Sequence, residues 1–73
     1  MKKIFVQNYG IITMFNVYDK MGEAISIDVY YENGRYEIRA DHQFVATGED
    51  RNQVDDEIFD FMKAENLSFV KPL

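Results

Sequence analysis

Five residues between positions 55 and 60 carry the clearest chemical pattern in the chain. They are four carboxylates and one phenylalanine: Asp55, Asp56, Glu57, Phe59 and Asp60. On a helix that turns by about 100° per residue, Asp56, Glu57 and Asp60 cluster opposite the apolar stripe. Carboxylates in such an array can take the place of phosphates on a basic protein, with an aromatic ring beside them as an apolar anchor. We therefore predict a partner-binding surface at these five residues.

The same residues allow simpler interpretations, which the sequence leaves open. A helix dipole favours acidic residues near its N-terminus, so this face can be merely solvated. Phe59 can fold over the edge of a sheet instead of contacting a partner. The run from Asp55 to Glu57 has neither calcium-loop spacing nor a glycine at a turn, so it predicts no metal site.

The net charge of the chain is concentrated in the same region. The 73 residues include 13 Asp and Glu against 8 Lys and Arg, for a net charge of −5. Seven of the acidic residues and only two of the basic ones lie between residues 49 and 65. The remaining six acidic and six basic residues cancel in net charge. A generic nucleic-acid binder has the opposite sign. We expect a basic, nucleic-acid-binding protein as the partner, contacted through a mimic of nucleic acid, and no direct binding of nucleic acid.

Other kinds of chemistry find little support in the composition. The chain has no cysteine, which excludes a disulfide, a thiol nucleophile and a cysteine-ligated metal. His42 is the only histidine, and we expect it to be exposed in a turn. The four glycines are isolated from one another, so no phosphate-binding loop is present. We expect no enzymatic activity, no cofactor and no metal.

The length and the apolar runs predict one small domain over residues 1–73. No run approaches the roughly 18 apolar residues of a membrane span. The apolar run after Lys2 and Lys3 stops after three residues, too early for a secretion signal. These features predict a cytoplasmic protein that does not contact a membrane.

The strongest structural signal lies between Ala24 and Ala40, where apolar and polar residues alternate as in a half-buried strand. Asn33 and Gly34 interrupt the alternation with the dipeptide best suited to a type I′ turn. This turn predicts the cross-strand pairs Glu32 with Arg35, Tyr31 with Tyr36, Tyr30 with Glu37, Val29 with Ile38, and Asp28 with Arg39. The apolar pairs then share one face, and two of the three pairs on the other face are oppositely charged.

The rest of the chain predicts further strands at residues 2–7, 11–19 and 43–47, and a helix at about residues 51–65. Asp50 and Gln53 fit a capping box at the start of this helix, and Asn66 suits its end. The apolar stripe of the helix consists of Val54, Ile58, Phe61 and Met62. The tail at residues 68–72 suggests a short edge strand. We predict an α+β fold: an antiparallel β-meander of four to five strands with one amphipathic helix packed on one face.

A single helix can cover only one face of this sheet. The segment at residues 11–19 is apolar on both sides, with Ile11, Phe15 and Val17 on one side. The uncovered face would then carry Ile12, Met14, Tyr18 and Tyr30. This face is the alternative interaction surface, and it would make the protein a homodimer or another homo-oligomeric accessory or structural module.

Two family resemblances bear on the function. Residues 30–34 (Tyr-Tyr-Glu-Asn-Gly), the charged strand after them and the acidic helix resemble small phage-encoded anti-CRISPR proteins, which are short, acidic and varied in fold. That resemblance implies a stoichiometric inhibitor, encoded by a phage or mobile element, that occludes a nucleoprotein machine.

The second resemblance concerns residues 34–38 (Gly-Arg-Tyr-Glu-Ile), residues 46–48 (Ala-Thr-Gly) and the helix after Asp50. Their order is similar to the strand, strand, glycine and helix of HicB-like antitoxins. The chain departs from that family at Val54 and Asp55, where a Glu-Ala pair is usual, and no DNA-binding module follows. The resemblance implies toxin neutralisation.

Overall fold

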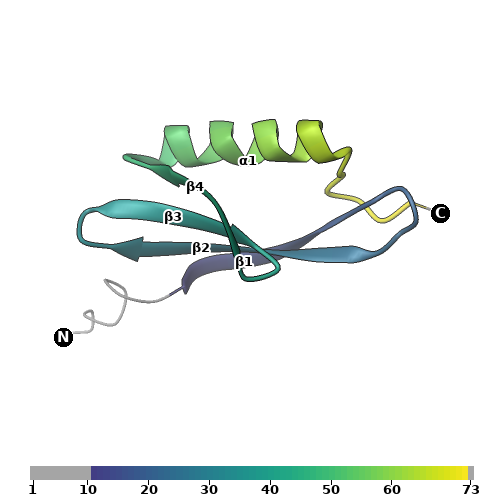
Figure 1. The fold of residues 1–73 in the computed structure, drawn as a ribbon, viewed down its shortest axis with the longest axis horizontal. Coiled ribbons are helices and arrows are strands. Elements are labelled where there is room, and N and C mark those ends of the chain that lie inside the picture. The colour runs from purple at the N-terminus through teal and green to yellow at the C-terminus, as the bar shows by residue number, and fades with distance from the viewer. Residues whose placement is uncertain (1–10, 73) are drawn as a thin grey trace.

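The computed structural model describes residues 11–72, which form one antiparallel sheet with a helix on one face (Figure 1). The strands are β1 (Ile11–Tyr18), β2 (Ala24–Glu32), β3 (Arg35–Ala40) and β4 (Gln43–Gly48), paired in sequence order. The helix α1 (Arg51–Glu65) follows β4. The predicted α+β meander is confirmed with four strands, while the strand predicted at residues 2–7 lies outside the described residues.

The hairpin of β2 and β3 has the predicted register, with all five cross-strand pairs as expected. Asn33 and Gly34 take φ angles of 54° and 79°, as a type I′ turn requires. The ion pairs, however, form with other partners than the cross-strand ones. Arg39 Nε lies 2.6 Å from Glu37 Oε2, because residues two apart on one strand point to the same face.

A bulge in β1 changes the predicted alternation at its start. The register shifts between Ile11 and Thr13, so Ile12 is the extra residue of the bulge. From Thr13 to Tyr18 the alternation is as predicted. Ile11 instead occupies the register position opposite Tyr30, whereas the sequence predicted it on the same side of the strand as Phe15 and Val17.

The bounds of α1 agree with the prediction because both of its caps form. The Asp50 carboxylate accepts a hydrogen bond of 2.9 Å from the Gln53 N–H. The Gln53 side-chain oxygen accepts one of 2.6 Å from the N–H of Glu49, so the capping box reaches one residue further back than usual. Asn66 ends the helix in the left-handed conformation, with a φ of 57°.

The hydrophobic core lies between α1 and one face of the sheet. Three helix residues spaced by four, Val54, Ile58 and Met62, are buried, whereas Phe61 of the predicted stripe is half-buried. They pack against the buried sheet residues Val17, Ile27, Val29, Ile38 and Ala40. One consequence of this packing is that α1 has a fixed orientation, which sets where its polar residues point.

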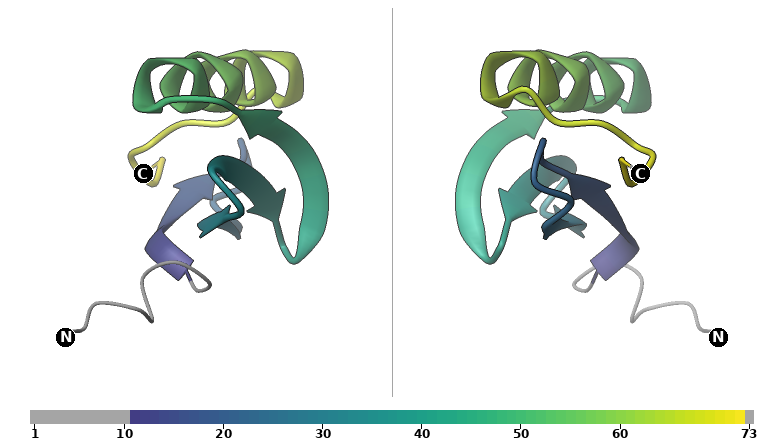
Figure 2. Two further views of the ribbon diagram at one scale, coloured as in Figure 1. Left: turned by 90° about the vertical axis from the view of Figure 1, so that its left-hand side faces the viewer. Right: turned by 90° about the vertical axis from the view of Figure 1, so that its right-hand side faces the viewer.

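The sheet curls, so that the two sides of α1 have different neighbours (Figure 2). On one side β4 rises to the helix, and on the other side the chain after α1 passes between the helix and β1. The predicted edge strand in this tail is only a single bridge, in which Tyr18 and Ser68 exchange backbone hydrogen bonds of 2.8 and 2.9 Å. Within residues 11–72, no helix combines the length and the apolar character needed to cross a membrane.

Candidate partner-binding site

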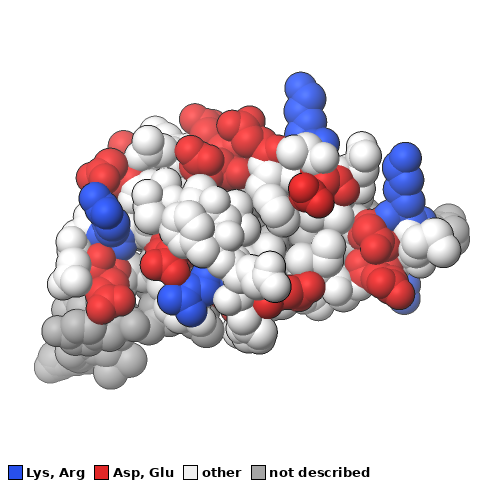
Figure 3. All heavy atoms as spheres, viewed as in Figure 1, with Lys and Arg blue, Asp and Glu red and all other residues white. Residues whose placement is uncertain are grey.

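The acidic residues of α1 lie on the side of the helix that the core leaves open. Asp55, Asp56 and Asp60 are exposed, and Glu57 is half-buried. In Figure 3 acidic atoms gather along the upper edge of the molecule, over α1. Among residues 11–72, no hydrogen bond or ion pair engages the carboxylates of Asp55, Asp56 or Asp60. They are therefore available to a partner.

The five predicted residues do not all point the same way. Asp55 and Phe59 are four residues apart and both line a groove beside β1. Asp56 and Asp60 are also four residues apart and point to solvent, away from the core stripe. Glu57 falls on the other flank of the helix. The structure thus brings Asp55, Asp56, Phe59 and Asp60 together and leaves Glu57 at their border.

Phe59 is 57% exposed, but its ring is not isolated. The ring meets that of Phe69 edge-on, with 5.8 Å between centroids, and Phe69 lies 6.0 Å from the ring of Phe15 in β1. Three phenylalanines therefore connect α1, the tail and β1. The sequence predicted that this tail returns to the sheet as a short edge strand, but it did not place Phe69 beside Phe59 in the candidate site.

A groove of about 320 Å³ lies between α1 and β1, next to these three rings. Its charged lining residues are Arg51 and Asp55, and its apolar walls include residues of the hydrophobic core. The lining residues from the sheet and tail are Thr13, Phe15, Val29, Tyr36 and Phe69; those from α1 are Arg51, Val54, Asp55, Ile58 and Phe59. The groove was not predicted, because it depends on how the tail packs.

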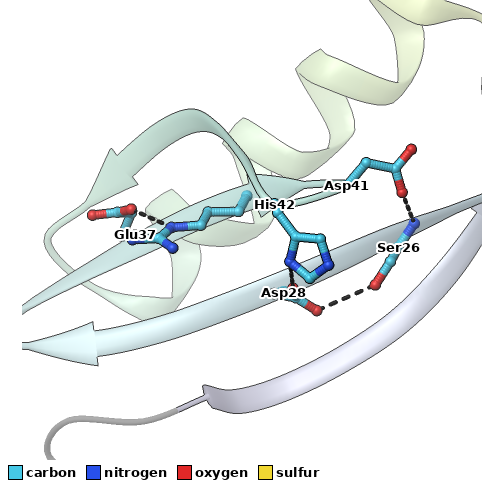
Figure 4. Close-up of polar contacts among 6 residues, drawn as sticks. Ser26, Asp28, Glu37, Asp41 and His42 are labelled. Atoms are coloured by element: carbon cyan, nitrogen blue, oxygen red, sulfur yellow. Dashed lines mark hydrogen bonds and ion pairs between the residues drawn. The ribbon is translucent and has the colours of Figure 1, made fainter.

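The far face of the sheet holds a buried carboxyl group at Asp28, which is 0% exposed (Figure 4). Ser26 Oγ donates a hydrogen bond of 3.3 Å to Asp28 Oδ1, whereas Oδ2 has no hydrogen-bond partner. His42 Nδ1 lies 3.7 Å from Oδ2, beyond hydrogen-bond distance. The sequence placed Asp28 opposite Arg39, which is its register partner, but did not predict its burial.

The turn between β3 and β4 holds His42 over Asp28. Asp41 accepts a hydrogen bond of 3.0 Å from the Ser26 N–H through its carboxylate and donates one of 2.8 Å from its own N–H to the Ser26 carbonyl. The His42 side chain is exposed, as predicted. In a catalytic triad the imidazole stands between hydroxyl and carboxylate, but here the Ser26 hydroxyl donates directly to the carboxylate. This geometry is not that of a triad.

Arg39 covers another part of the far face. Its guanidinium lies 4.5 Å from the centroid of the Tyr30 ring and is hydrogen-bonded to Glu37. The hydrogen bond that Arg39 donates to the Glu37 carboxylate raises the pKa of Arg39 above its ordinary value. Arg39 and Tyr30 thus form a fixed polar group on this face.

The residues of the alternative oligomer face are unequally exposed. Met14 is 60% exposed, whereas Tyr18 and Tyr30 are half-buried and Tyr30 lies under Arg39. The side chain of Ile12 lies outside those that the structure describes. Within the described side chains, Met14 is therefore the member of this set that is most open to a partner.

The part of the chain that the structure describes contains no group of three or more His, Cys, Asp or Glu residues placed to hold a metal ion. Comparisons of the chain with protein-family models, with curated proteins and with solved structures find no match.

Proposed function

We propose that this chain is a non-enzymatic protein-binding module, a stoichiometric inhibitor or regulator that occludes a basic, nucleic-acid-binding partner. Its contact region would be the acidic helix surface, formed by Asp55, Asp56, Glu57, Phe59 and Asp60. The observation that supports this proposal is the exposure of three unpaired aspartates around an exposed phenylalanine on one helix.

The packing of α1 explains why such a surface would be effective. Val54, Ile58 and Met62 fix the helix on the sheet, so its carboxylates need little ordering on binding. Their charge would speed the encounter with a basic partner and would occupy sites that otherwise bind phosphates. In this proposal the protein acts in the cytoplasm. Its short, acidic chain resembles phage-encoded inhibitors of nucleoprotein machines.

Two variants with the same change in net charge test the proposal. The first replaces Asp55, Asp56 and Asp60 with Asn. The control replaces three exposed acids outside the five-residue surface, through Glu23→Gln, Glu32→Gln and Glu65→Gln, the last at the C-terminal end of α1. Immobilised wild-type protein and both variants are incubated with host lysate at low and high salt, and the captured proteins are identified by mass spectrometry.

We expect the wild type and the control to capture the same basic partner in stoichiometric amount at low salt, and to lose it at high salt. The variant without the three aspartates should not capture it. The purified partner should also lose bound DNA when wild-type protein is added. Equal capture by the aspartate variant, or DNA retained by the saturated partner, would contradict the proposal.

A second candidate is a homo-oligomeric accessory module or a HicB-like antitoxin-type protein that associates through the far face of the sheet. The exposure of Met14 favours it. Light scattering distinguishes the two candidates. The first predicts a monomer at high micromolar concentration, whereas the second predicts a dimer that Met14→Asp separates into monomers.

A further inference from the structure

We infer that the groove between α1 and β1 binds one large apolar side chain from a lysine- or arginine-rich segment of the protein partner. This inference rests on the proposed function, because the groove and the acidic helix surface share Asp55 and Phe59. It adds a second kind of contact to the electrostatic one. The partner segment would be amphipathic, with an aromatic or branched aliphatic anchor among basic residues.

The size and the walls of the groove suit such an anchor. Its volume of about 320 Å³ lies at the lower end of the roughly 300–1,000 Å³ that is typical of ligand pockets. Phe59 and Phe69 remain 57% and 49% exposed although both rings border it. Since an inserted side chain would cover part of both rings, binding would remove apolar surface from water.

The walls are also held in place before a partner arrives. The edge-on contact of Phe59 with Phe69, and that of Phe69 with Phe15, join the helix, the tail and β1. The backbone bridge between Tyr18 and Ser68 fixes the tail immediately before Phe69. A preformed pocket lined by aromatic rings is the setting in which a single anchor residue contributes most to affinity.

The charges around the groove indicate that the anchor comes from a basic segment. Asp55 lines the groove, and Asp56 and Asp60 continue from it over the exposed side of α1. The cationic residues of the helix lie at its two ends: Arg51 in the first turn, where it also lines the groove beside Asp55, and Lys63 in the last turn. An anchor beside Phe59 would therefore place its neighbouring lysines or arginines against the three aspartates.

A pair of synthetic peptides tests this inference. Both are lysine-rich, fluorescein-labelled and identical except at the central residue, which is tryptophan in one and alanine in the other. Their affinities for the full chain are measured by fluorescence anisotropy at low salt. We expect the tryptophan peptide to bind roughly tenfold more tightly than the alanine peptide, as for an anchor in a pocket.

Three variants localise the effect. Phe59→Ala removes one wall, and Thr13→Tyr fills the groove from β1, where Thr13 is exposed. Either change should bring the affinity for the tryptophan peptide down to that for the alanine peptide. The matched control is Phe44→Ala, which removes a phenylalanine that is 64% exposed and does not line the groove. It should leave the tenfold difference unchanged.

The possible results separate this inference from the proposed function. If both peptides bind equally and both lose affinity when Asp55, Asp56 and Asp60 become Asn, the groove inference is wrong and the electrostatic proposal stands. If neither peptide binds at low salt, both are contradicted. A tryptophan advantage that survives in Phe59→Ala and Thr13→Tyr also overturns the groove as its site. So does light scattering that shows a wild-type dimer which Phe59→Asp separates, because a second copy would then fill the groove.

Discussion

The two flanks of α1 differ in how closely they approach the sheet. On the β4 flank Gly48 is buried against the helix, and a Cβ atom there would lie only 2.9 Å from Val54 Cγ2. On the β1 flank the same helix leaves a groove of about 320 Å³. Two residues join β4 to α1 on the first flank, and two residues join α1 to the bridge at Ser68 on the second, where the tail lies between the helix and β1 (Figure 2). The flanks therefore differ in what packs against the helix: β4 itself on one side, and on the other the tail, whose Phe69 ring borders the groove.

The largest expected effect concerns the core beneath both flanks. Ile38→Ala removes a side chain that is 0% exposed and leaves a cavity. We expect a loss of about 2–5 kcal/mol in the free energy of unfolding, measured by urea denaturation followed by circular dichroism. A loss below about 1 kcal/mol would show that the core collapses around the change.

The next effect tests the closely packed flank. Gly48→Ala places a methyl group against Val54, so either the helix or the end of β4 must shift. We expect a destabilisation of about 1–3 kcal/mol in the same denaturation experiment. The double variant Gly48→Ala with Val54→Ala should recover part of the stability lost through the clash. If the effects of the two changes on the free energy of unfolding simply add, the predicted contact is contradicted.

A smaller effect is expected on the far face, away from both flanks. Asp28→Asn keeps an oxygen for the Ser26 hydroxyl and replaces the unpartnered oxygen with an amide that can donate towards His42 Nδ1. Since a buried polar atom without a partner is unfavourable, we expect a gain of about 1 kcal/mol in stability. If Asn destabilises the fold instead, Asp28 has a contact that the described residues do not account for.

The smallest effect on stability is expected at the open flank. Phe59→Ala removes a ring that is 57% exposed and gives up one aromatic contact with Phe69. The free energy of unfolding should fall by less than about 1 kcal/mol, while the tryptophan advantage in peptide binding is lost. A fall as large as that of Ile38→Ala would mean that Phe59 is a core residue and not a contact residue.

The features that the sequence predicted correctly depend on residues close together in the chain. Asn33 and Gly34 set the register of the hairpin, and Asp50 with Gln53 set the start of α1. The groove depends on Phe69 returning to Phe15, a contact between opposite ends of the described chain. No local periodicity reports such a contact, because it is decided by how α1 and the tail pack in three dimensions.

On the far face of the sheet, too, the local sequence pattern did not predict the packing. Alternation placed Asp28 on the polar side of β2, where it faces solvent in an ideal flat sheet. The β3–β4 turn covers it instead, since Asp41 binds Ser26 and brings His42 over the carboxyl group. The alternation of apolar and polar residues also did not predict the bulge in β1, which moves Ile11 to the position opposite Tyr30.

The central claim is that the position of the acids on α1 matters, and not only the net charge of the chain. The most direct test is the affinity of the lysine-rich tryptophan peptide for two variants that lose the same charge, measured over a range of salt concentrations. Replacing Asp55, Asp56 and Asp60 with Asn should weaken binding at low salt by roughly tenfold or more and flatten its salt dependence. The control at Glu23, Glu32 and Glu65 should stay close to the wild type. Equal losses in the two variants would contradict the claim, because they would show that net charge alone attracts the peptide.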